Sequence, residues 1–211
     1  MSNRSGVLVL LTVCLVMVSG CKAFDFLGYM VAPKGKTKIT AEYDGLAKGE
    51  QVLVLVYADE ATLFEYPFAR YEVAEFVAEE LRDKLHVEVL DNQQVARFQE
   101  QTLDWEAMPL SQIGARFGAD VVLYLELLEF TTREQGSQNL YRGRIRAAGT
   151  MVRLNSADAP MRVWQNEVLA IYPDAAPVSS LSTTDQNIRG MALRRFAQSL
   201  GQRFYDHTKT M

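Results

Sequence analysis

The stretch VLVLVY, residues 52–57, decides the fold of this chain. It is a continuous run of β-branched, aliphatic and aromatic side chains, and such a run predicts a strand buried on both faces. A helix is predicted after it, over residues 68–85, because apolar side chains recur there at helical spacing. That apolar stripe comprises Val73, Ala74, Val77, Ala78, Leu81 and Leu85. A short strand over residues 87–90 completes a parallel strand–helix–strand unit.

Two further helices precede the longest predicted strand. Asp91 or Asn92 can cap a helix that starts near Gln93. Residues 110–117 predict another short helix, and Gly118 is placed to end it. Residues 121–130 then form the longest predicted strand.

After residue 130 the pattern changes to an antiparallel meander of three strands. Turn residues at 135–139 and 155–160 separate the strand at 121–130 from strands at about 140–154 and 162–172. In the middle strand, Arg residues alternate with small or apolar ones and therefore point to one face. These are Arg142, Arg144 and Arg146, with Glu126, Glu129 and Glu134 as predicted cross-strand partners. A solvated sheet face is preferred here over an anion site.

The two ends of the domain complete the predicted fold. A short edge strand is predicted over residues 38–43, and the last helix begins near Asp185, where Thr183 and Gln186 have capping-box spacing. Its apolar positions fall four apart, at Ile188, Ala192, Phe196, Leu200 and Phe204. The predicted fold class is α+β. A mixed sheet has a βαβ(αα) half followed by a three-stranded antiparallel meander and a C-terminal helix.

Four segments carry a resemblance to a group of envelope domains. They are VLVLVYAD (52–59), EVAEFVAEELRDKLHVEVLD (72–91), IGARFGADVVLYLELLEF (113–130) and MVRLNSADAPMRVWQNE (151–167). The group includes the curli-secretion lipoprotein, the lipoprotein activators of penicillin-binding proteins and the amino-terminal domain of the Tol-system propeller protein. The chain resembles uncharacterised bacterial lipoproteins with such a domain. The resemblance implies binding to other proteins and assembly in the cell envelope, without catalysis.

The N-terminus indicates export and lipid attachment. Arg4 precedes an apolar run over residues 7–18, and small residues follow it, which is the layout of a secretory signal peptide. The run is shorter than the roughly twenty residues of a transmembrane helix; an uncleaved N-terminal anchor helix is the alternative. Val18-Ser19-Gly20-Cys21 resembles the bacterial lipobox. The resemblance implies a signal peptide over residues 1–20, cleavage between Gly20 and Cys21, and diacylglycerol with acyl chains such as palmitate on Cys21.

Residues 21–37 are predicted to be a lipid-anchored tether, and residues 38–211 a single α+β periplasmic domain. Lys22 follows the lipidated Cys. The enterobacterial sorting rule reads an Asp at that place as inner-membrane retention, so its absence favours the outer membrane. The tether ends in the basic stretch PKGKTK, residues 33–38. A solvated spacer is preferred there over contact with anionic headgroups.

Charge and composition argue against several classes of site. The formal net charge is −4 and the pI is about 5.3, whereas nucleic-acid binding requires a basic face, so no nucleic-acid partner is expected. Cys14 lies in the signal peptide and Cys21 carries the lipid, which leaves no free thiol and no disulfide in the mature domain. His86 and His207 have no neighbour at ligand spacing. No metal site and no cofactor are expected.

Side chains after the first buried strand form the candidate functional site. Asp59 and Glu60 follow that strand at the edge where open α/β sheets often bind ligands. Aromatic residues cluster around the same loop: Tyr57, Phe64, Tyr66, Phe68 and Tyr71. One interpretation is a partner surface made of Asp59, Glu60, Phe64 and Tyr66. The preferred interpretation is a loop folded over the end of the sheet, with the aromatic side chains in the core.

No catalytic residue is predicted, and the chain is interpreted as a non-enzyme. Asp104 and Glu106 lie on a loop, where nothing fixes the separation of two carboxylates that glycoside hydrolysis requires. The predicted function is protein–protein interaction in the envelope, as an accessory or assembly factor. Envelope proteins and further copies of the chain are the candidate partners. The alternative is a periplasmic carrier that binds a small molecule, a glycan or a lipid in a cleft near Asp59.

Overall fold

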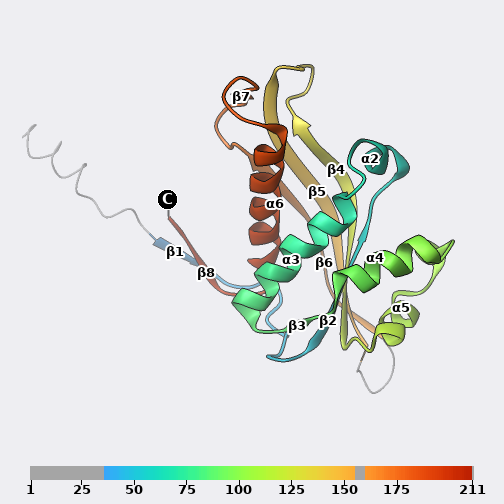
Figure 1. Cartoon of the computed structure of the whole chain (residues 1–211). Helices are drawn as coiled ribbons and strands as arrows, with labels where there is room; N and C mark the ends of the chain where they lie inside the picture. The colour runs from blue at the N-terminus through green and yellow to red at the C-terminus, as the bar shows by residue number, and fades with distance from the viewer. Residues whose placement is uncertain (1–35, 155–159, 211) are drawn as a thin grey trace, which may run out of the picture. The chain divides into compact units, whose positions relative to one another are not determined.

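A computed structural model describes residues 36–154 and 160–210. Its main sheet has the strand order β3–β2–β4–β5–β6 (Figure 1). The short strand β7 also belongs to this sheet and pairs with β5. The strands are β2 (Gln51–Tyr57), β3 (Glu88–Val89), β4 (Val121–Arg133), β5 (Leu140–Arg153), β6 (Met161–Tyr172) and β7 (Val178–Ser179). β2 is parallel to β3 and β4, whereas β4, β5 and β6 are antiparallel. The predicted α+β class, with its mixed sheet and meander, is confirmed.

Helices cover both faces of β2. They are α2 (Glu60–Glu65), α3 (Ala69–Leu85), α4 (Asn92–Gln101), the 3-10 turn η1 (Trp105–Ala107), α5 (Leu110–Phe117) and α6 (Asp185–Gly201). Figure 1 shows α3 and α6 side by side over one face of the sheet. Val52, Val54 and Val56 belong to the core on that side, while Leu53 and Leu55 pack with residues of α4 and α5. Every residue from 52 to 56 is at most 1% exposed, which explains the uninterrupted apolar run.

The predicted helix ends are confirmed at two positions. The Asp91 side chain caps α4 by accepting a hydrogen bond from the backbone N–H of Gln93 at 2.9 Å. Gly118 ends α5 with a φ of +70°, a conformation that glycine adopts without a steric penalty. Local sequence signals were sufficient here because each cap is made within four residues.

The cap of α6 differs from the predicted one. Thr184, not Thr183, is the N-cap: its Oγ1 accepts a hydrogen bond from the backbone N–H of Asn187 at 3.2 Å. Thr183 Oγ1 instead accepts from the Asn187 side-chain amide at 3.0 Å. Both Thr residues therefore bind the same Asn, and spacing alone assigned the cap to the wrong one.

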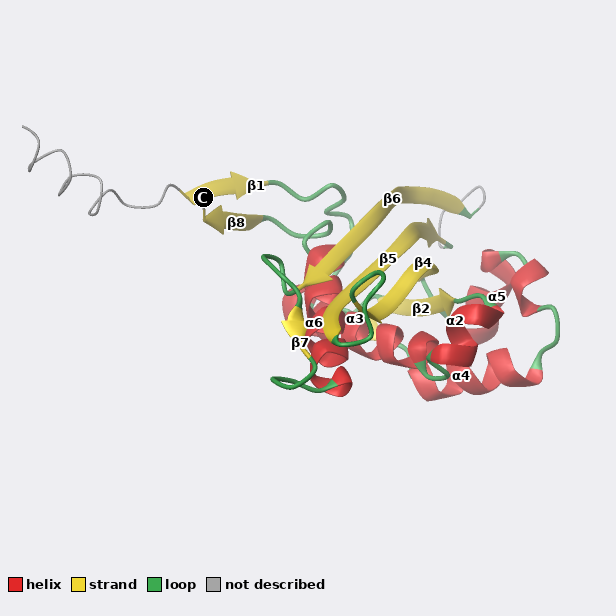
Figure 2. Ribbon diagram, turned by 90° about the horizontal axis from the view of Figure 1, so that it is seen from above, coloured by secondary structure: helices red, strands yellow, loops and turns green. Residues whose placement is uncertain are grey.

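A second, two-stranded sheet is formed by β1 (Lys36–Ile39) and β8 (His207–Thr210). The two strands run in opposite directions (Figure 2). The edge strand predicted over residues 38–43 is wrong in its bounds, since β1 covers residues 36–39. Glu42 and Tyr43 lie outside the strand, and their backbone N–H groups both donate to Arg203 O, at 2.8 and 3.1 Å. Residues 36–38 with 208–210 form one compact unit, and residues 39–207 form another.

Helix α6 lies directly against β5. A Cβ atom added at Gly143 would lie 2.5 Å from Ala192 Cβ, closer than real carbon atoms approach. The small residues at both positions allow this packing. The predicted apolar positions Ile188, Ala192, Phe196, Leu200 and Phe204 are each at most 2% exposed. Helix α6 ends at Gly201, however, so Phe204 is buried from the segment after the helix and not from the helix itself.

The predicted signal peptide, Gly20, Cys21 and most of the tether lie outside the described residues, as does most of the predicted turn at 155–160. Across residues 36–154 and 160–210, no helix combines the length and the apolar character that a membrane crossing requires.

Candidate functional site

Helix α2 follows the carboxyl end of β2, and the four residues of the predicted partner surface lie within it or directly beside it. Asp59 is its N-cap, and one side-chain oxygen accepts a hydrogen bond from the backbone N–H of Thr62 at 2.7 Å. Hydrogen bonds from the Thr62 side chain and backbone lower the pKa of Asp59. The Asp59 carboxylate thus fixes the start of α2, and Glu60 is the exposed first residue of the helix.

Tyr66, the residue that follows α2, lies in the core and not on a surface. Its side chain is 5% exposed, and its ring meets Phe130 edge to face at a centroid distance of 4.9 Å. Its hydroxyl oxygen accepts a hydrogen bond from the backbone N–H of Thr132 at 3.2 Å and lies 3.2 Å from Thr132 Oγ1. Thr132 Oγ1 in turn donates to Asp185, the first residue of α6.

This contact has a clear structural origin. β2 pairs with β4 only as far as Tyr57 opposite Glu126, so the last residues of β4 extend beyond it. Thr132 is 1% exposed, and its backbone N–H donates a hydrogen bond to the Tyr66 hydroxyl oxygen. The segment after β2 is therefore anchored to β4. For Tyr66 this agrees with the interpretation of a loop folded over the end of the sheet, with the aromatic side chain in the core.

Three large apolar side chains in the segments that follow β2 and α4 are exposed. Phe64 on α2 is 90% exposed, Phe68 at the start of α3 is 69% exposed, and Leu103 after α4 is 92% exposed. We call Glu60, Phe64 and Phe68 the α2 surface. The sequence analysis singled out Glu60, Phe64 and Phe68, but its preferred interpretation, with the aromatic side chains in the core, is wrong for Phe64 and Phe68. It gave no signal for Leu103, an isolated apolar residue in a polar loop.

Two contacts hold the segment around Leu103 near the end of β2. The side-chain amide of Gln99 donates to Val56 O at 2.8 Å, and the side chain of Gln99 is buried. The rings of Trp105 and Tyr57 lie 6.4 Å apart between centroids. Leu103 is therefore held between two anchors that both contact the last residues of β2.

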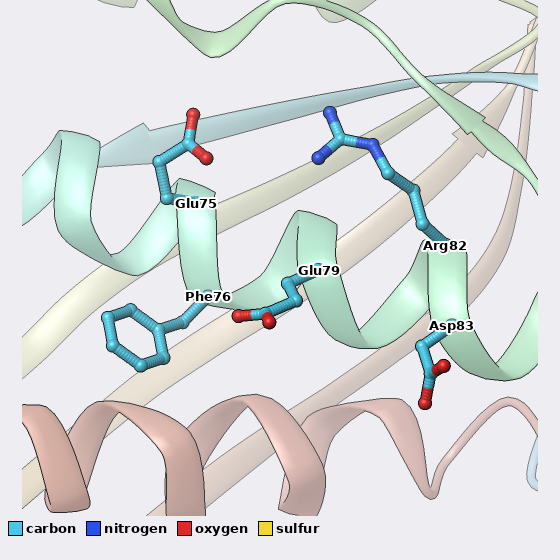
Figure 3. A pocket seen from close by; sticks show the side chains of 5 residues that line it. All are labelled: Glu75, Phe76, Glu79, Arg82 and Asp83. Carbon is cyan, nitrogen blue, oxygen red and sulfur yellow. The ribbon is translucent and has the colours of Figure 1, made fainter.

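An acidic groove runs along α3. Its two hollows measure about 500 and 360 Å³. Glu75, Phe76, Glu79, Arg82 and Asp83 line the larger one, and Phe76, Glu79, Glu80, Asp83, Arg194 and Ala197 line the other. Figure 3 shows Phe76, Glu79 and Asp83 on the side of α3 that faces α6. Neither hollow is lined by Asp59, so they do not correspond to the cleft that the carrier interpretation places at the end of β2.

The groove contains ordinary ion pairing. Lys84 donates to the Asp83 carboxylate at 2.6 Å, and this hydrogen bond lowers the pKa of Asp83. Within residues 36–154 and 160–210, no group of three or more His, Cys, Asp or Glu side chains is arranged to hold a metal ion.

The arginine row on β5 faces a line of carboxylates. Arg142 lies 3.6 Å from Glu134, and Arg144 lies 3.0 Å from Glu129. Arg146 pairs with Glu129 at 3.8 Å and with a β6 carboxylate, that of Glu167, at 3.5 Å. Of the predicted partners, Glu129 and Glu134 are confirmed. Positive charge in this row is balanced across the strands, as expected for a solvated sheet face.

No protein-family model and no curated protein matches the sequence. Among solved structures, the chain is similar to the PelC dodecamer from Paraburkholderia phytofirmans, with a TM-score of 0.47 and 13% identity over 81% of this chain and 99% of that chain. It is also similar to the lipoprotein GNA1162 from Neisseria meningitidis, with a TM-score of 0.45 and 16% identity over 72% and 99% of the two chains.

A third similar structure is the C-terminal domain of LpoB from Salmonella enterica, with a TM-score of 0.37 and 15% identity over 61% of this chain and 87% of that chain. Lipoprotein domains are thus among the structures to which the chain is similar, as the resemblance in the sequence predicted. At these identities and scores the likeness assigns no function to the chain.

Proposed function

We propose that this chain is a non-catalytic, lipid-anchored protein of the bacterial envelope that binds another envelope protein through the α2 surface. The observation that supports the proposal most strongly is the 90% exposure of Phe64 on a helix that is fixed at both ends. Asp59 caps the start of α2, and Tyr66 anchors the residue after it to Thr132. The exposed ring is therefore presented in a defined place before any partner binds.

The chemistry of the α2 surface suits a protein partner. Single exposed apolar residues are common on soluble proteins, but here two aromatic side chains four residues apart, Phe64 and Phe68, are 90% and 69% exposed. Aromatic anchors of this kind contribute strongly to binding when they enter an apolar pocket of a partner. Glu60 adds a charge at the rim of the surface.

The proposed anchor is the lipid on Cys21. In this proposal the signal peptide, residues 1–20, is removed after Gly20, and residues 21–37 tether the domain over residues 38–211 to the membrane. The protein faces the periplasm, and Lys22 in place of an Asp favours the outer membrane. Two or more acyl chains give a stable anchor without a spanning helix.

Site-specific photocrosslinking in intact cells tests the proposed surface. A photoreactive amino acid replaces Phe64, and the matched control carries it at Leu181, which is 96% exposed on the loop before α6. A defined product with another envelope protein is expected from position 64 and not from position 181. The same products at both positions, or none at position 64, would refute the α2 surface as the binding site.

Substitution then gives the size of the effect. Burying a Phe side chain contributes roughly 1.5–3 kcal/mol, so Phe64→Ala is expected to weaken partner binding about 10- to 100-fold. The melting temperature is expected to stay the same, because the ring is almost fully in solvent in the free protein. A crosslinked product of twice the monomer mass would instead identify a second copy of the chain as the partner.

A further inference from the structure

The last strand of the main sheet, β6, has one edge without a neighbouring strand. It stands at the end of the strand order and pairs there with β5 alone (Figure 2). Among the described residues, no backbone hydrogen bond from outside the sheet reaches residues 161–172. Because β6 is twelve residues long, its free edge presents a row of backbone donors and acceptors onto which another strand can pair.

A hydrogen bond of Glu167 identifies the backbone groups at this edge. Its backbone N–H donates to the Asn166 side-chain Oδ1 at 2.8 Å and is therefore not directed to β5. In an antiparallel pair, residues that bond to the neighbouring strand alternate with residues that do not, and the pairing of β5 with β6 is regular from Trp164 to Tyr172. Leu169 and Ile171 consequently direct their N–H and C=O groups to the same free edge as Glu167.

The second half of β6 lacks the features that protect edge strands. Proteins block such edges with charged side chains, Pro or bulges. The segment VLAIY, residues 168–172, contains no charged residue and no Pro, and the register shift between β5 and β6 lies beyond Trp164. Val168 and Ala170 belong to the core, whereas Leu169 on the opposite face is 46% exposed.

We infer that β6 pairs antiparallel with β6 of a second copy of this chain, around a two-fold axis at Leu169, and that the two main sheets become one. In this register Leu169 faces Leu169 of the other copy, and Glu167 faces Ile171. Each free N–H of these residues then meets a free C=O, which gives about six backbone hydrogen bonds. The pairing uses none of the residues of the α2 surface.

Side-chain chemistry favours a second copy in this register. Any extended segment can satisfy the backbone groups, but a second copy also places the same apolar side chain against Leu169 by symmetry. An axis at Val168 would place Leu169 against Glu167 instead. An axis at Glu167 would place two carboxylates opposite each other, which destabilises a sheet.

Oxidative crosslinking of the full chain in intact cells tests the pairing. In the hydrogen-bonded pair on the axis the two Cα atoms lie about 5.5 Å apart, within the roughly 4.4–6.8 Å that a disulfide spans, so Leu169→Cys is expected to give a disulfide-linked dimer. Leu128→Cys is the matched control, because Leu128 is 41% exposed on β4, two strands away. Glu167→Cys checks the register, because its Cα would lie about 14 Å from its counterpart.

The inference predicts a dimer from position 169 and not from positions 128 and 167. Equal yields at 128 and 169 indicate random collision and overturn it. So does a product at 167 without one at 169, a product of 169 with another protein in place of the dimer, or no product at any position. The wild-type chain gives the background from Cys14 and Cys21. A wild-type dimer shows a free thiol and counts against the lipid anchor, whereas the comparison of 169 with 128 still tests the pairing.

Leu169→Glu measures the contribution of the axis to assembly. Arg146 stands opposite Leu169 in β5, so the new carboxylate gains a cation in its own chain but faces a like charge across the axis. The dissociation constant of the dimer is expected to rise about tenfold in analytical ultracentrifugation of the detergent-solubilised protein. Leu128→Glu should leave it unchanged, and circular dichroism shows whether both variants keep the fold. Equal dissociation constants for the two folded variants overturn the inference.

Discussion

The hydroxyl of Tyr66 is expected to stabilise the fold through one buried hydrogen bond. In Tyr66→Phe the ring still packs on Phe130, but the backbone N–H of Thr132 loses the acceptor that lies 3.2 Å away. Thr132 is 1% exposed, so water cannot easily replace that acceptor. A buried donor left without a partner costs about 1–3 kcal/mol.

That cost is large enough to measure. At about 2 kcal/mol, the melting temperature of a domain of this size falls by roughly 4–8 °C. Differential scanning calorimetry and urea unfolding of the purified protein would give the change in the free energy of unfolding. Phe64→Ala is the matched control on the same segment, because its ring is 90% exposed, and it should leave the transition in place.

An unchanged transition in Tyr66→Phe would show that the hydroxyl does not satisfy Thr132, and the anchoring of α2 would need another explanation. Tyr66→Ala, which also removes the ring, is expected to cost about 3–5 kcal/mol in the free energy of unfolding. If Phe64→Ala were the more destabilising of the two Ala substitutions, the assignment of core and surface on this segment would be reversed.

Three further predictions follow from other parts of the chain. Gly143→Val should lower the free energy of unfolding by about 1–3 kcal/mol in urea titrations, because a Cβ there lies 2.5 Å from Ala192 Cβ; an unchanged midpoint would contradict the packing of α6 on β5. Burial opposes ionisation of Glu42, but hydrogen bonds from Trp164 and other side chains outweigh it and lower its pKa below 4.5. Its contribution to stability is therefore present above about pH 4.5 and lost as the pH falls through the lower folded pKa, so the difference in melting temperature between wild type and Glu42→Gln should shrink with acidification, and a constant difference would contradict this. Cys21→Ala should release the protein from the membrane fraction, as measured by sedimentation and immunoblotting; unchanged pelleting would contradict the lipid anchor.

Local patterns in the sequence determined most of the fold. The apolar run at 52–57 predicts a buried strand correctly because β2 is covered on both faces. The fourfold spacing from Ile188 to Leu200 predicts a helix correctly because one side of α6 is buried. Asp91 and Gly118 make their contacts within a few residues, so their capping roles follow from sequence alone. Each of these features depends on periodicity or on neighbours along the chain.

Contacts between distant residues decided the rest. Phe64 and Tyr66 are both aromatic and lie two residues apart, so their residue types alone do not predict which side chain is buried. Because the pairing of β2 with β4 ends at Glu126, the backbone N–H of Thr132 has no partner in β2 and donates to the Tyr66 hydroxyl. The Phe64 side chain, in contrast, is 90% exposed. The pairing of β1 with β8 likewise joins residues about 170 positions apart. Tertiary structure fixes such features because burial and pairing depend on which distant segments meet, and no local pattern records that.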